Sequence, residues 1–183
     1  MTHWYPTHWY GSDTSETPVA LTTDDLAADY NLLDDVDDVL TAATIDGATA
    51  FTAVSWATSD RQARQVQQAK SSPLACIVYD RKELDQTLTD NEYGALIRCH
   101  IRVAVWKNTS LSQKTRIQEL QKYVNAAQRA ILESPPTNSE DWGGAHSFHH
   151  RIEFGSPALD VNQTDPWAVA TIPLTIAYRM SLA

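Results

Sequence analysis

The chain has 183 residues, of which 43% are apolar and 20% are charged, which is enough for one compact core and too little for a second independent one. No apolar run approaches the roughly 20 residues of a membrane-spanning helix, and no basic segment precedes an apolar stretch as in a secretory signal. Cys76 and Cys99 both lie in apolar stretches, which predicts buried free thiols rather than a disulfide. We therefore expect a soluble single-domain protein from a reducing compartment.

The net charge of −9 is concentrated in the first third of the chain. Eleven of the 23 acidic residues and none of the 14 basic residues precede Arg61. Because an acidic surface repels phosphate, this distribution argues against specific nucleic-acid binding by the first third. Such a run is either a solvated helix face or the complement of a basic partner surface.

The first 21 residues predict an extended arm. The pattern Thr-His-Trp-Tyr-Pro at residues 2–6 recurs as Thr-His-Trp-Tyr at residues 7–10, and turn-forming residues follow without apolar periodicity. Four large aromatic side chains cannot form a core alone, and exposed Trp and Tyr concentrate at protein interfaces. We expect the arm to bind a neighbouring subunit or another protein through Trp4, Tyr5, Trp9 and Tyr10, although a cloning remnant is an alternative.

Residues 22–46 predict a helix that begins at Thr22 or Thr23 and is stopped by Asp46-Gly47. Its apolar residues recur every three or four positions, whereas most of its aspartates fall off that stripe. Because we expect these aspartates to be exposed to water, no desolvation should separate their pKa values. The aspartates of interest are Asp34, Asp35, Asp37 and Asp38. Residues 48–57 then favour a strand.

The rest of the chain predicts helices alternating with strands. A short helix over 60–70 with Ala63, Val66 and Ala69 buried precedes a strand at 74–79. The strand at 96–106 alternates between a core face and a face that bears Arg98, His100 and Arg102. A helix from Ser110 or Ser112 to about 132, a strand at 146–154, a loop and a final strand at 167–180 follow. In that last strand, Pro173 predicts an edge position or a bulge.

This order predicts an α+β fold, a mixed and mainly antiparallel β-sheet with helices packed on one face. Residues 22–183 would form the single domain, preceded by the arm at 1–21.

Candidate chemistry is sparse. His146, His149 and His150 invite a metal interpretation, but on a strand only His146 and His150 share a face, and no recognised metal motif is present. A small metal-dependent hydrolase built on His146, His150 and Asp165 is thus a minor alternative. We expect no catalytic residue, metal or cofactor. The face with Arg98 and Arg102 is either solvated or pairs with the acidic helix of a neighbouring copy, and such a head-to-tail contact closes into a ring where the rotation permits.

Three features together resemble the bacteriophage tail terminator (tail completion) family. They are the short helix ending in Ser71-Ser72-Pro73 before the strand at 74–79, the strand at 97–105 leading into the helix at 112–132, and the closing strand at 167–178. The resemblance is architectural and covers about 120–150 residues. The long acidic and aromatic N-terminal portion departs from typical short members of the family, which suggests additional contacts.

The resemblance implies a homohexameric ring that caps the tail tube and joins it to the head. Its partners would be further copies of itself, the tail tube protein and the neck or connector protein, with the sheath as a further candidate. Another neck or head-completion adaptor is the alternative in the same class. The protein would be made in the host cytoplasm and reside in the virion, away from membranes, and would touch passing DNA only weakly and non-specifically. Because a lumen that attracts phosphate would retain DNA, we expect the aspartates of residues 24–38 to line the lumen or the subunit boundary.

Overall fold

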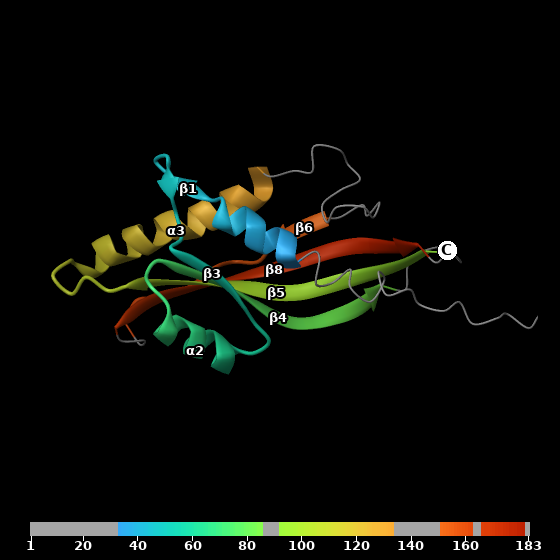
Figure 1. Cartoon of the computed structure of the whole chain (residues 1–183), viewed down its shortest axis with the longest axis horizontal. Helices are drawn as coiled ribbons and strands as arrows, with labels where there is room; N and C mark the ends of the chain where they lie inside the picture. The colour runs from blue at the N-terminus through green and yellow to red at the C-terminus, as the bar shows by residue number, and fades with distance from the viewer. Residues whose placement is uncertain (1–32, 86–91, 134–150, 163–165, 182–183) are drawn as a thin grey trace, which may run out of the picture.

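The computed structural model describes residues 33–85, 92–133, 151–162 and 166–181, so the predicted arm lies outside the described residues. The main sheet has the strand order β3-β4-β5-β8-β6, with β7 also paired to β8 (Figure 1). β3 and β4 are parallel, and the other pairs are antiparallel. The bounds are β1 (Thr44–Ile45), β2 (Ala48–Thr49), β3 (Ala53–Ala57), α2 (Asp60–Ala69), β4 (Leu74–Asp85), β5 (Glu92–Trp106), α3 (Gln113–Glu133), β6 (Arg151–Phe154), β7 (Ala158–Asp160) and β8 (Trp167–Ser181). The predicted α+β class is confirmed.

One face of the sheet carries the main core. Ile101 of β5 and Leu120 of α3 are completely buried in it, as the period of two in the strand and the apolar stripe of the helix predict. The helix over residues 33–41 packs on the same face, with Leu40 among its fully buried side chains. Figure 1 shows this helix and α3 on the same side of the sheet. The core therefore fixes the acidic helix relative to β5 and β8.

The opposite face is covered at its β3–β4 end by α2 (Figure 1). Ser59 caps this helix, and its Oγ accepts a hydrogen bond from the amide of Gln62 at 3.3 Å. Ala63 packs against Cys76 and Val78 of β4, which places α2 on the face that faces away from the main core. The sequence predicts the bounds of α2 to within one residue. The prediction that the helices pack on one face of the sheet is wrong for α2, because Ala63 is buried against the β4 residues that alternate with those of the main core.

The buried side of α2 differs from the prediction. Val66 is only half-buried and Ala69 is exposed, whereas Gln67 is 3% exposed. The apolar residues at positions 66 and 69 lie too far around the helix to face β4, so a polar side chain takes the buried position after Ala63. Gln67 is tolerated there because it has a buried hydrogen-bond partner, described below.

A hairpin replaces the end of the predicted helix. Helical residues end at position 41, and β1 pairs with β2 through Thr44 opposite Thr49. Asp46 and Gly47 form the turn between them with positive φ angles of 52° and 80°. Asp-Gly is favourable both in a tight hairpin turn and at the end of a helix, and in this chain it forms a hairpin turn. The predictions of a helix to 46 and of one strand over 48–57 are therefore wrong at this point.

Pro173 does not lie at a sheet edge. β8 pairs with β5 on one side and with β6 and then β7 on the other. Pro173 lies where the outer partner changes, and its carbonyl accepts a hydrogen bond from the amide of Gly155 at 2.9 Å. The nitrogen and the carbonyl of one strand residue point to the same side of the strand. The Pro173 nitrogen, which carries no hydrogen, therefore points to the gap between β6 and β7, where no N–H donor is needed. β7 itself falls within the predicted loop, since three residues carry no readable pattern.

The central strands are longer than predicted. β4 continues to Asp85 and β5 begins at Glu92, so the two strands and β8 extend past the helices at one end of the molecule (Figure 1). The polar residues at 81–83 indicate a loop in the sequence, but a part of the sheet that none of the described helices covers needs no apolar alternation. None of the described helices is long and apolar enough to cross a membrane.

Candidate interaction surfaces

A row of charged side chains follows β5 on the face that α2 partly covers. The side chains of Arg98, His100 and Arg102 share this face, because the alternate residues of the strand lie in the main core. The prediction that one strand face is polar is confirmed. Each of the three has a partner within the same chain.

Arg98 belongs to a cluster around Glu83. Its Nε donates to Glu83 Oε2 at 2.8 Å, and Arg81 Nε donates to Glu83 Oε1 at 2.6 Å. Hydrogen bonds, first from Arg98 and then from Arg81, lower the pKa of Glu83. The side chain of Arg98 remains 43% exposed, so part of its guanidinium still faces solvent beside a carboxylate of its own chain.

His100 bridges two carboxylates from different elements. Its Nδ1 lies 3.2 Å from Asp80 Oδ2, and its Nε2 lies 3.2 Å from Asp60 Oδ1. Asp60 is the first residue of α2, and Asp80 lies at the irregularity in the β4–β5 pairing. The imidazole, whose side chain is 13% exposed, thus links the start of α2 to the sheet.

Arg102 lies beneath α2. The residue is 9% exposed, and its Nε donates to Gln67 Oε1 at 3.1 Å. Burial is the main cause that lowers the pKa of Arg102, with the positive charge of Arg64 adding to it. Little of this guanidinium is left for a neighbouring copy, and its hydrogen bond explains why Gln67 is buried.

The acidic helix carries two exposed and two half-buried aspartates. Asp34 and Asp38 are exposed, whereas Asp35 Oδ2 and Asp37 Oδ1 are shielded from water and have no hydrogen-bond partner among the described residues. Burial, followed by the charges of Asp38 and Asp34, raises the pKa of Asp35 to about 6 and also raises that of Asp37. The expectation that water keeps these pKa values together is therefore wrong, because the packing of the helix on the core desolvates part of its polar side.

The two cysteines are free and buried, as predicted. Burial raises the pKa of Cys76 to about 11 and that of Cys99 to about 12, so both thiols stay protonated and unreactive in the folded protein. His146 and His150 lie outside the described residues. Within the described ranges, no three His, Cys, Asp or Glu side chains gather in a way that could hold a metal ion.

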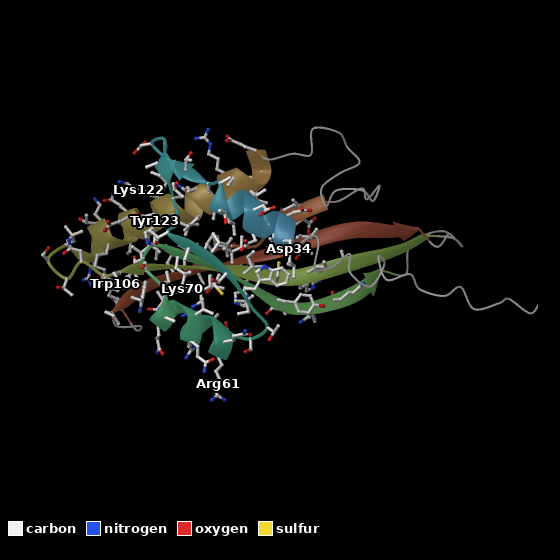
Figure 2. The ribbon with its side chains drawn as sticks, viewed as in Figure 1. Asp34, Arg61, Lys70, Trp106, Lys122 and Tyr123 are labelled. Carbon is white, nitrogen blue, oxygen red and sulfur yellow. The ribbon has the colours of Figure 1, made fainter. Side chains whose placement is uncertain are left out.

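An exposed aromatic side chain ends the row on β5. Trp106 is 60% exposed, and its ring packs edge-on against Trp167 with 5.5 Å between the ring centroids. Figure 2 shows Trp106 towards the left end of the molecule, whereas Asp34 lies near its middle. The exposure of Trp106 was not predicted, although its spacing of four residues from Arg102 and two from Ala104 places it on the same strand face.

The predicted contact residues thus fall on three surfaces. The aromatic arm with Trp4, Tyr5, Trp9 and Tyr10 lies outside the described residues, Arg98 and Arg102 lie on the α2 side of the sheet, and Asp34 and its neighbours lie on the other side. No protein-family model matches this chain, and neither does any curated protein.

Proposed function

We propose that this chain is a structural protein of a tailed bacteriophage, a tail terminator that forms a ring on the tail tube and joins it to the neck. The observation that carries the proposal is the way in which α2, β4, β5, α3 and β8 fold together. These are the elements on which the family resemblance rests, and β4, β5 and β8 are neighbours in one sheet.

Ring formation needs two unlike surfaces on each copy, because a head-to-tail contact joins different patches. The two sides of this sheet differ in that way. One carries the helix over 33–41 with its four aspartates, and the other carries α2 with the side chains of β5. This difference supports a closed homo-oligomer of the kind that the family resemblance implies, a hexamer.

In this role the protein would act by shape and charge without catalysis or a cofactor. The tail tube protein would contact one rim of the ring and the connector the other, and the aromatic arm would hold a neighbour. Acidic side chains at the lumen or at the subunit boundary would limit retention of passing DNA. The protein would be made in the host cytoplasm and reside in the virion.

The proposal is tested on the purified full-length protein by light scattering and electron microscopy. We expect a mass near six copies and rings with a central opening, and we expect the rings to bind to the ends of tail tubes and to stop tube growth. A monomer at every concentration, absent from assembled particles, would contradict the proposal. Rings that bind the connector and leave tube growth unchanged would instead identify the alternative, a neck or head-completion adaptor.

A further inference from the structure

Three exposed cations of α2 and its C-terminal cap have no ion pair in the described part of the chain. Arg61, Arg64 and Lys70 are all exposed, and none of them makes an ion pair with a described residue. Figure 2 shows Arg61 pointing away from the sheet at the outer side of α2. The single acid of this helix, Asp60, is directed to His100. Within the described residues these three cations are not neutralised by an ion pair, and we call Arg61 and Arg64 of the helix, with Lys70 at its C-terminal cap, the α2 cationic surface.

The other side of the sheet presents the complementary charge. Asp34 and Asp38 are exposed and one turn apart on the helix over 33–41, so they share a side of that helix. Neither has an ion pair with a described residue. We call Asp34 and Asp38 the aspartate surface, and Figure 2 shows Asp34 across the sheet from Arg61.

The other cations near the sheet are less suited to pair with the aspartate surface of a second copy. Arg98 is bound to Glu83, Arg102 is bound to Gln67, and Arg129 of α3 pairs with Glu133 at 2.7 Å. The exposed lysines of α3 lie on the same side of the sheet as the aspartate surface. A contact between the same sides of two copies pairs them about a two-fold axis, whereas opposite sides can continue from copy to copy.

We propose that the α2 cationic surface of one copy docks on the aspartate surface of the next copy and forms the subunit boundary of the ring. This inference rests on the proposed function, and it assigns the aspartates to the subunit boundary rather than to the lumen. The partner is a second copy of this chain, selected by charge complementarity between two helices on opposite sides of one sheet. Arg61 and Arg64 would approach Asp34 and Asp38, with Lys70 at the margin.

Charge reversal on each surface tests the contact. In one variant Arg61→Glu and Arg64→Glu make both surfaces acidic, and in the other Asp34→Lys and Asp38→Lys make both basic. Because like charges then face each other, we expect each variant alone to associate at least about tenfold more weakly in light scattering. Mixing the two variants restores opposite charges at every boundary, so we expect rings of alternating copies to return. One chain that carries all four substitutions should also assemble.

The control is Lys114→Glu with Lys122→Glu on α3, which changes the net charge by the same amount as the α2 variant and should leave assembly unchanged. Circular dichroism of each variant establishes that it is folded. Wild-type rings should also weaken as salt rises from about 50 mM to about 500 mM, because exposed charge pairs are screened.

Three results would overturn the inference, and they are distinguishable from one another. Rings that persist in both charge-reversed variants would place the boundary elsewhere and leave the proposed function standing. Loss of assembly that the mixture does not restore would mean that the α2 cations bind another partner, such as DNA phosphates. A wild-type chain that never associates would remove the proposed function together with this contact.

Discussion

The packing of the acidic helix on the core raises the pKa of Asp35 above that of a solvated carboxyl group. Its pKa of about 6 lies above the ordinary value of 3.8, because burial and the charges of Asp38 and Asp34 both disfavour the ionised form. The folded chain therefore holds this proton to a higher pH than the unfolded chain does. Ionised Asp35 thus lowers stability, and this effect grows between pH 3.8 and pH 6 and is complete above that window.

We expect Asp35→Asn to stabilise the folded protein at pH 7.5 and to have little effect near pH 4. The asparagine keeps the shape of the side chain and cannot ionise. After an allowance for solvent screening of a half-buried group, the gain in free energy of unfolding at pH 7.5 is about 1 kcal/mol. Urea unfolding at the two pH values measures it. Asp46→Asn removes a carboxylate from an exposed turn and serves as the control, and a gain independent of pH would contradict the explanation.

The sequence could not predict the partial burial and raised pKa of Asp35. The helical pattern divides residues only into those on the apolar stripe and those on the polar side of the helix. Residues at the border of the stripe are desolvated by whatever lies beside the helix. Gln67 was missed for a similar reason. Its burial depends on Arg102, which lies 35 residues away and becomes a neighbour only when α2 crosses the sheet. Arg98 and Arg102 were found because strand alternation alone assigns them to one face.

Among the helices and strands, the sequence predicts those with a regular spacing of apolar residues and does not predict the short strands. β5 and α3 were predicted from alternation and from the 3-4 spacing of apolar residues. The hairpin of β1 and β2 and the three-residue strand β7 depend on turn geometry and on neighbours distant in sequence. Asp46-Gly47 illustrates the difficulty, because the same dipeptide ends helices and makes hairpin turns.

The junction of β6, β7 and β8 depends on a glycine. A Cβ added to Gly155 would lie 2.9 Å from Pro173 Cβ, too close for the two residues to keep their positions. We expect Gly155→Ala to lower the free energy of unfolding by about 1–3 kcal/mol in urea titrations, as overpacking does. Gly155→Asn should lower it at least as much, since the clash arises at Cβ.

Gly47 provides the contrasting control for this prediction. Nothing lies within 4 Å of a Cβ added there, but its φ of +80° disfavours most side chains. Asparagine tolerates that region better than alanine does, so Gly47→Asn should be milder than Gly47→Ala. If asparagine also rescued position 155 relative to alanine, backbone strain rather than the contact with Pro173 would explain the effect.

At the scale of the whole molecule, opposite charges lie on opposite sides of one sheet. The helix over 33–41, which carries Asp34 and Asp38, and the cations of α2 are close in sequence, yet the sheet separates them in space (Figure 1). A single copy cannot bring these two helices together. In the proposed ring, the next copy would neutralise both surfaces, so the proposed contact relates the charge distribution of the sequence to assembly.

The aromatic arm provides a second test of that view. Because the first 21 residues show no apolar periodicity of a packed helix or strand, we expect the Ser substitution of Trp4, Tyr5, Trp9 and Tyr10 to shift the unfolding midpoint by no more than about 2 °C. Association measured by light scattering should weaken, since large aromatic side chains at interfaces contribute much of the binding energy. The matched control replaces Thr2, Thr7, Ser12 and Ser15 in the same segment with alanine and should leave both measurements unchanged. If the aromatic variant lost cooperative unfolding, the four rings would belong to the core of their own chain, and the arm would not act as a contact between subunits.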